Sequence, residues 1–476
     1  MADTSDCPAW GRWSLFPLGL VGLGVPACGD GGPTSPPPAL TSISVSHERV
    51  AFTGLGEVVT LVASARDQRG NPLSGVTIVW SAGDPAVVTV TDAGNVRSVA
   101  DGETTLTASS GSVSTTVPVT VHVWASLSAG GAHTCALTPA GETYCWGENA
   151  HGQLGHGPTV LESNGPLLVP GAPTFASIAA GHEHTCGLTP AGDAFCWGNN
   201  ESGQLGDGES RSRQETPVPV SGGLTFQTIA PGGLHTCGVT LAGEAYCWGS
   251  PNLVGYLGDG TTQPAHTPVA VVGGHTFRTI ALGGEHSCGL TDAFVTDCWG
   301  QNNRAQLGSG SSSAFGTTPA AISGGLRFES ITAWANHSCG LTASNVAHCW
   351  GRNDSGQLGA GTTNAATVPV AVAGGLAFQA IAAGSEFSCG LSTTGAGHCW
   401  GLNDKGQLGD GLTTASSLPH PVMGNLEFQA ITAGGRHACG LTTGLAAYCW
   451  GDNTLGTLGT GGDESPTSAP ARVADR

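Results

Sequence analysis

Residues 131–157 read GAHTCALTPAGETYCWGENAHGQLGHG, and this stretch recurs seven times along the chain. Each copy contains two cysteines ten positions apart, and the second cysteine opens a Cys-Trp-Gly triplet. Successive copies are separated by 50 or 51 residues. A repeat of this length is typical of a propeller or a solenoid, in which each unit buries its apolar surface against its neighbours.

Each copy predicts a pair of short antiparallel strands. In the first copy, the strands lie on either side of residues 138–141, whose sequence Thr-Pro-Ala-Gly has turn chemistry. Gly141 would take the φ > 0 position of a three-residue hairpin loop. The equivalent residue is glycine in three other copies but Phe294, Asn345 and Leu445 in the rest, which must turn differently or under strain.

This hairpin places the two cysteines of each copy directly opposite each other. A facing antiparallel pair has Cβ atoms about 4.5–5.5 Å apart, and its Cα spacing suits a disulfide. Structural zinc and free buried thiols are the alternatives, but the short cysteine knuckle typical of zinc is absent from the sequence. We therefore predict seven disulfides, which join Cys135 with Cys145, Cys186 with Cys196, Cys237 with Cys247, Cys288 with Cys298, Cys339 with Cys349, Cys389 with Cys399, and Cys439 with Cys449.

The composition indicates a turn-rich all-β protein. The chain has 476 residues, of which 77 are glycine, and only 10% are charged. The 15 Lys and Arg residues are outnumbered by 34 Asp and Glu, which gives a formal net charge of -19. A surface that follows a nucleic-acid backbone is hard to build from so few dispersed cations, so we expect no nucleic-acid partner.

The N-terminal residues are typical of an export signal. Residues 13–25 are an apolar segment too short to span a bilayer as a permanent helix. The sequence Val-Pro-Ala-Cys that ends at Cys28 resembles a bacterial lipobox, in which Cys28 would be lipidated; a non-lipidated signal peptide or a misassigned start is the alternative. We predict a signal peptide at residues 1–28 and a Gly/Pro-rich tether at residues 29–39. The expected location is the cell envelope or surface, with the membrane contacted only through the lipid anchor.

Residues 40–123 contain no cysteine and read as short strands separated by Gly, Asn, Asp and Pro turns. About seven strands in about 85 residues predict a sandwich of the immunoglobulin kind. The segments that begin at Trp80 (Trp-Ser-Ala-Gly-Asp-Pro) and Gly102 (Gly-Glu-Thr-Thr-Leu-Thr-Ala) resemble the bacterial Ig-like group 2 domain. This resemblance implies a spacer or adhesive element on a cell-surface protein. Trp80 is expected to anchor the core.

From Trp124 onward, each copy predicts four strands. An aromatic residue opens the copy, the two cysteine strands follow, and a Gly-Gln-Leu-Gly segment such as residues 152–155 leads into a Pro-Val strand. Over residues 124–473 these features resemble the regulator of chromosome condensation repeat. The resemblance implies a seven-bladed β-propeller at residues 124–476. The predicted fold is therefore all-β, with an immunoglobulin-like β-sandwich before the propeller.

How the ring closes is left open by the repeats. The chain ends in a strand of the type that ends a copy, and Trp124 opens a strand of the type that begins one. If blades are offset from repeats, residues 124–127 would pair beside the last repeat and close the ring, which would leave no exposed sheet edge.

Two sets of polar residues suggest metal at first sight. Six copies carry histidine two residues before the first cysteine, and Phe387 takes the seventh place. These side chains alternate with the cysteines along the strand, so we expect them to point into blade-to-blade packing. Asp-Gly steps at Asp207, Asp259 and Asp410 lack the spaced oxygen ligands of known calcium loops and favour turns. We expect neither metal nor cofactor.

The most informative irregularity lies in the loop before the histidine. It differs between copies, and Trp334 replaces a glycine there. If the seven loops share one rim, they form a binding surface. The candidate rim residues are Trp334, Asn336, Glu183, Leu234, Glu285, Glu386 and Arg436. Trp334 either contacts a partner or folds back onto a neighbouring blade.

The sequence favours a binding function over catalysis. It contains no nucleophile elbow, paired-carboxylate motif, phosphate loop or His-Glu-x-x-His motif, so we expect no enzyme. We predict a monomeric surface protein whose propeller binds a protein ligand. The alternative is a carbohydrate-binding adhesin that binds a surface glycan. The resemblance also implies guanine-nucleotide exchange on a small GTPase, but export, acidic charge and even repeat spacing disfavour it.

Overall fold

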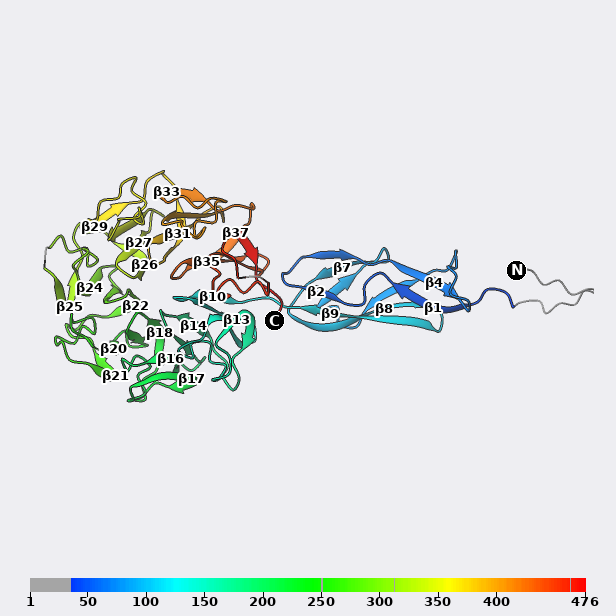
Figure 1. The fold of residues 1–476 in the computed structure, drawn as a ribbon, viewed down its shortest axis with the longest axis horizontal. Coiled ribbons are helices and arrows are strands. Elements are labelled where there is room, and N and C mark those ends of the chain that lie inside the picture. Colours follow the sequence, from blue (N-terminus) through cyan, green and yellow to red (C-terminus); the bar gives the residue numbers. More distant parts are fainter. Residues whose placement is uncertain (1–35, 250, 312, 463) are drawn as a thin grey trace, which may run out of the picture.

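The computed structural model describes residues 36–249, 251–311, 313–462 and 464–476. In these ranges all 37 regular elements are β-strands. Accordingly, the described part of the chain offers no helix long and apolar enough to cross a membrane. The predicted signal peptide, its Cys28 and most of the predicted tether lie outside the described residues. Figure 1 shows two units, which we call the N-terminal module (residues 40–121) and the ring (residues 126–472).

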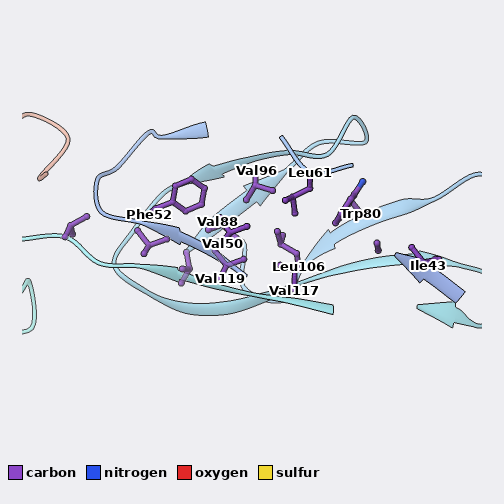
Figure 2. Packing of buried hydrophobic residues seen from close by; sticks show 14 residues of the cluster. Ile43, Val50, Phe52, Leu61, Trp80, Val88, Val96, Leu106, Val117 and Val119 are labelled. Atoms are coloured by element: carbon purple, nitrogen blue, oxygen red, sulfur yellow. The ribbon is translucent and has the colours of Figure 1, made fainter. Parts of the chain in front are cut away.

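The N-terminal module contains nine strands in three sheets, ordered β2-β9-β8-β5, β3-β7-β6 and β1-β4. The strands are β1 (Leu40–Val45), β2 (Val50–Phe52), β3 (Val58–Thr60), β4 (Ala63–Asp67), β5 (Val79–Ala82), β6 (Val88–Val90), β7 (Asn95–Ser98), β8 (Gly102–Ser110) and β9 (Val113–Val121). Alternating apolar residues of these strands meet in one buried cluster, in which Phe52, Leu106 and Val96 come from three different strands (Figure 2). Trp80 also packs in this cluster.

The ring consists of seven four-stranded antiparallel sheets, and each sheet is formed by one sequence repeat. The innermost strands are β10 (Ser126–Ala129), β14 (Ser177–Ala180), β18 (Phe226–Pro231), β22 (Phe277–Leu282), β26 (Phe328–Trp334), β30 (Phe378–Ala383) and β34 (Phe428–Ala433). The second strands are β11 (His133–Leu137), β15 (His184–Leu188), β19 (His235–Thr240), β23 (His286–Thr291), β27 (His337–Thr342), β31 (Phe387–Ser392) and β35 (His437–Thr442).

The outer half of each blade completes this pattern. The third strands are β12 (Thr143–Glu148), β16 (Ala194–Asn200), β20 (Ala245–Gly249), β24 (Thr296–Gln301), β28 (Ala347–Gly351), β32 (Gly397–Gly401) and β36 (Ala447–Gly451). The fourth strands are β13 (Glu162–Leu168), β17 (Arg211–Pro219), β21 (Ala265–Ala270), β25 (Phe315–Ala321), β29 (Ala366–Ala371), β33 (Ser416–Pro421) and β37 (Thr467–Arg472).

The two ends of the ring meet without sharing a sheet. Strand β10 pairs with β11 of its own repeat, so residues at the start of the ring do not pair beside the last repeat. The first and last blades are joined instead by hydrogen bonds between separate sheets. The Gly435 amide donates to the Gly130 carbonyl at 2.9 Å, and the Trp146 indole donates to the Thr457 carbonyl at 3.0 Å. The ring therefore closes through the same kind of contacts that join its other blades.

The hairpin between the second and third strands keeps one geometry in all seven blades. Gly141 has φ of 81°, and Phe294, Asn345 and Leu445 have φ of 61°, 63° and 63° at the equivalent position. The three copies without glycine thus make the same left-handed turn, at a cost of roughly 1–2 kcal/mol each for a residue with a Cβ. Leu445 gains a contact in return, because its side chain packs against the core of the N-terminal module.

The hairpin register places the two cysteines of every blade opposite each other. All seven pairs predicted from the sequence are bonded in the structure, with Cα atoms 4.0–4.1 Å apart. The cysteines are at most 1% exposed, so reductants reach them only when a blade opens.

A recurring set of hydrogen bonds joins neighbouring blades. At the first junction the carbonyl of Gln153 accepts the Trp197 indole N–H and the Thr185 hydroxyl of the next blade, both at 3.0 Å. Because that hydroxyl proton is used, the hydroxyl accepts the Nε2–H of His133 at 2.9 Å. The histidine-to-hydroxyl bond recurs at five more junctions, and the last runs from His437 to Thr134 of the first blade.

At the junction of the sixth and seventh blades, both the histidine and the hydroxyl residue are replaced by apolar residues. Phe387 stands where the other blades have histidine, and Ala438 stands where the next blade would supply the hydroxyl. Both are buried in one apolar cluster. A buried hydroxyl without its partner would cost roughly 1–3 kcal/mol, so the two positions are coupled.

The N-terminal module is attached to the outer edge of the ring, at the first and last blades. The Leu55 amide donates to the Gly444 carbonyl at 2.7 Å. The Arg476 guanidinium contacts both carboxylate oxygens of Asp101 at 2.8 Å and lies 5.7 Å from the Trp124 ring centroid. The module extends sideways from the ring and does not overlap its centre in the view of Figure 1.

We expect loss of the disulfides to destabilise the ring without changing its fold, because each closes a short loop worth about 2–3 kcal/mol. The protein is unfolded in urea with a reductant, refolded with the thiols kept reduced, and melted beside the oxidised protein. A lower melting temperature with similar tryptophan near-ultraviolet circular dichroism is the expected result. An unchanged melting temperature would contradict the role of the bonds.

A double-mutant cycle tests the junction. Ser388→Ala leaves the buried His337 Nε2–H without its acceptor, and His337→Phe removes the donor to the Ser388 hydroxyl, which keeps its bond to the Gln357 carbonyl; each is expected to cost about 1–3 kcal/mol. The double variant reproduces the pair found at Phe387 and Ala438, so we expect it to recover at least half of the summed loss in the free energy of unfolding. Strictly additive losses in urea titrations would show that the two residues are not coupled.

Acid should destabilise the ring through its buried histidines. Burial lowers the pKa to about 3 for His133, His184, His235 and His337, and to about 4 for His286 and His437. In the unfolded chain their pKa is about 6.5, so below this pH the unfolded state binds protons that the folded state does not. We expect the melting temperature to fall between pH 7 and pH 5, and to fall less in the double variant, which has one histidine fewer. A melting temperature that is flat over this range would refute the expectation.

Candidate binding site

The loops between the innermost and second strands meet at one end of the ring's channel, and we call this end the rim. Six of the seven loops begin with a glycine; five of these pack against their own blade's histidine and against the next blade, and Gly384 packs against the Phe387 ring. A Cβ on Gly283, for example, would lie 2.2 Å from the His286 ring and 2.9 Å from the Ala335 carbonyl oxygen. The residue after the glycine donates its amide to the next blade, as from Gly131 to the Gly181 carbonyl at 3.0 Å. The rim is therefore a tight circle of backbone.

The fifth blade departs from this circle at Trp334. Strand β26 continues to Trp334, which pairs with His337, and Ala335 then has φ of 40°. Gly284 of the preceding blade donates to the carbonyl of Ala335, one residue later than at the other junctions. Across the described ranges, no backbone hydrogen bond continues the circle from Ala335 to Gly384. The circle is open at this point.

A cavity of about 510 Å³ lies at this opening. Its walls come from five consecutive blades, the second to the sixth. Five of the seven predicted rim residues line it, namely Trp334, Asn336, Glu183, Leu234 and Glu285. Trp334 is half-buried and also lines a smaller cavity of about 210 Å³ along the channel, where most of the lining residues are alanines or other small side chains. Trp334 thus stands where the rim cavity meets the channel.

The two carboxylates of the cavity have neutral hydrogen-bond donors. Glu183 accepts the amide of Asn199 at 2.7 Å, and Glu285 accepts that of Gln301 at 2.5 Å. Among the described residues, neither glutamate is ion-paired with lysine or arginine. Both are half-buried and face a concave surface, so their charge is only partly screened by water.

A third carboxylate adds to the negative charge on this side. Burial raises the pKa of Glu148, and the nearby charge of Glu183 raises it further. The basic side chains near these groups are imidazoles: His151 and His182 each lie 3.7 Å from a Glu183 carboxylate oxygen. Thus the described residues place no lysine or arginine beside Glu183.

The two remaining rim residues lie outside the cavity and are neutralised. Glu386 is paired with Arg352 at 2.6 Å, and Arg352 also binds Asp354 at 2.8 Å. Arg436 is paired with Asp404 at 3.1 Å. The side chains of the fifth to seventh blades thus compensate one another, whereas those at the cavity do not.

Residues 177–476 match the model of the RCC1-like domain, and residues 140–188 and 124–153 match the regulator of chromosome condensation (RCC1) repeat. The chain belongs to the RCC1-like domain family. This confirms the repeat family and the propeller fold that the sequence predicts.

Curated relatives share the RCC1-like repeats over part of their length. Human E3 ubiquitin-protein ligase HERC2 is 31% identical over 253 residues, which are 50% of this chain and 5% of HERC2. The ultraviolet-B receptor UVR8 of Arabidopsis thaliana is 31% identical over 250 residues, which are 49% of this chain and 54% of UVR8. The match thus spans about half of UVR8 and a small part of HERC2.

Two solved RCC1-like structures are similar to the ring. Prp20p of Saccharomyces cerevisiae, studied for its binding to Gsp1p and histones, is 25% identical with a TM-score of 0.65, covering 71% of this chain and 87% of Prp20p. Yeast RCC1 (Prp20) in complex with Kap60 is 26% identical with a TM-score of 0.63, covering 70% of this chain and 83% of its own.

Sequence reasoning missed two residues of the cavity in this RCC1-like ring. Gln301 follows a Cys-Trp-Gly triplet, and its amide donates to the Glu285 carbonyl at 2.8 Å. Extending the predicted hairpin register by two residues would have placed it beside Glu285. Leu282 stands in a position that is alanine in five other blades. Comparing the repeats at the position just before that of Trp334, as was done for Trp334 itself, would have singled out Leu282.

The other polar candidates serve the RCC1-like framework. The six repeating histidines are buried in the blade junctions. The carboxylates of Asp207, Asp259 and Asp410 each accept a backbone amide two residues later, at 2.9–3.1 Å, which is turn geometry. The described residues hold no cluster of three or more metal-ligating side chains.

Proposed function

We propose that the RCC1-like ring is a protein-binding scaffold whose partner engages the cavity beside Trp334. The observation that carries this proposal is the replacement of a packed rim glycine by a half-buried tryptophan at the one open point of the backbone circle. Tryptophan at the edge of a preformed pocket is typical of residues that dominate binding energy. The binding of Prp20p to Gsp1p and histones also supports a protein partner.

We also propose that the protein acts at the cell envelope, attached through Cys28. The apolar segment and lipobox-like sequence support export, and buried disulfides in all seven blades suit an oxidising compartment. The N-terminal module would be an immunoglobulin-like spacer between the anchor and the ring, in line with its sheets packed around one core. In this arrangement the rim would face away from the attachment point.

Binding without catalysis is part of the same proposal. The six repeating histidines are used in blade junctions and are not available for acid-base chemistry. A glycan-binding adhesin is the second candidate, but sugar platforms usually combine several aromatic faces and the cavity offers Trp334 alone. Nucleotide exchange on a small GTPase would need a partner that the proposed location disfavours.

A pull-down with the oxidised full chain tests the proposal. Immobilised protein is exposed to envelope proteins and cell-wall glycans of the source organism, beside the variants Trp334→Gly and Arg436→Ala. We expect a stoichiometric protein partner that Trp334→Gly weakens by about tenfold and Arg436→Ala leaves bound. The melting temperature of Trp334→Gly should change little, because glycine occupies this place in six blades.

Three outcomes would count against it. A partner held equally by the protein and Trp334→Gly would place binding elsewhere. Loss of stability in Trp334→Gly without loss of a partner would make Trp334 structural. Retention of polysaccharide alone would support the adhesin instead.

A further inference from the structure

We infer that the cavity beside Trp334 binds a lysine or arginine side chain from a basic segment of a partner protein. This inference rests on the proposed function, since it names the chemistry of the partner at the same site. The supporting observations are the pattern of charge around the rim, the aromatic wall and the apolar residues beside it.

Charge on the rim is divided into two parts. In the fifth to seventh blades, Glu386 and Asp404 are already bound by Arg352 and Arg436. In the second and fourth blades, Glu183 and Glu285 accept side-chain amides, which orient a carboxylate without neutralising it, and neither has a lysine or arginine partner among the described residues. A ligand cation would therefore complete the ion pairing that the chain completes elsewhere with its own arginines.

Trp334 gives the site its preference for a cation over a neutral hydrogen-bond donor. An ammonium or guanidinium group over an indole face gains about 0.5–2 kcal/mol, most where water is excluded. Trp334 is half-buried and shares the cavity with both glutamates. The same residues would repel an anionic ligand.

Apolar residues complete the fit to a long basic side chain. Leu234 and Leu282 line the cavity beside Trp334 and can cover the methylene stem of lysine or arginine. A volume of about 510 Å³ exceeds that of one side chain, which leaves room for the backbone that carries it. The formal net charge of -19 would also attract a basic segment at a distance.

Peptide binding to the oxidised full chain tests this inference. The probe is a short fluorescein-labelled glycine-serine peptide with a central pair of arginines, and the control peptide has citrulline, the neutral analogue, at both places. By fluorescence anisotropy at low salt, we expect the citrulline peptide to bind at least about tenfold more weakly. Binding of the arginine peptide should also weaken as salt is raised.

Variants locate the binding site. Glu183→Gln and Glu285→Gln are each expected to weaken arginine-peptide binding by about three- to tenfold, and Trp334→Gly by about tenfold. Glu244→Gln is the matched control: it removes the same charge from an exposed hairpin at the opposite end of the third blade. It should leave binding within about twofold of the unchanged protein.

The outcomes separate this inference from the proposed function. Equal binding of the arginine and citrulline peptides, or equal weakening by Glu244→Gln, would overturn it. If the pull-down partner depends on Trp334 while the peptides show no charge preference, the inference is wrong and the scaffold proposal stands. If neither partner nor peptide depends on Trp334, both are wrong.

Discussion

The junction between neighbouring blades depends on one main-chain carbonyl that serves two donors. The carbonyl of Gln153 accepts an indole and a hydroxyl from the next blade, and a histidine of its own blade completes the set. Leaving any of these buried groups unpaired would cost roughly 1–3 kcal/mol, so the members must be kept or replaced together. Phe387 and Ala438 show the joint replacement. Because this set fixes how closely blades approach, it also fixes the spacing of the rim loops.

That close approach makes the rim a place where side chains are excluded. Five of the six rim glycines lie so near the adjacent blade that a Cβ would collide with one of its carbonyl oxygens, and at Gly384 a Cβ would collide with the Phe387 ring. Trp334 is accommodated only because Ala335 takes a positive φ and its carbonyl replaces the usual acceptor. The backbone cost at Ala335, of order 1 kcal/mol, falls at a rim-loop position where no other blade has a positive φ. The cavity is the direct result of that exception.

Features that depend on residues close in the sequence, such as the hairpins and the disulfides, could be predicted. Features that depend on contacts between blades could not. Cysteine spacing and turn residues determine the hairpin register, so the disulfide pairs could be predicted from a few neighbouring residues. From the sequence, residues 124–127 could pair either with their own repeat or beside the last repeat. The pairing of β10 with β11 shows that they belong to their own repeat. Glu386 and Arg436 were expected to face a ligand, but each is paired with a residue of the preceding blade, Arg352 and Asp404 respectively. These partners lie about thirty residues away in the sequence, so the spacing within one repeat does not reveal them.

Seven similar repeats give the ring near-symmetry, so any preferred direction of binding must come from side chains that differ. The N-terminal module is attached at the first and last blades (Figure 1). The cavity is lined by the second to sixth blades. A ligand at Trp334 would therefore meet the ring on the side away from the module. The same side carries the glutamates without arginine partners, whereas Arg476 is engaged with Asp101 and Trp124 at the module. The N-terminal module and the proposed ligand thus contact different blades of the ring. A partner can therefore bind at Trp334 without competing with the contacts that hold the module in place.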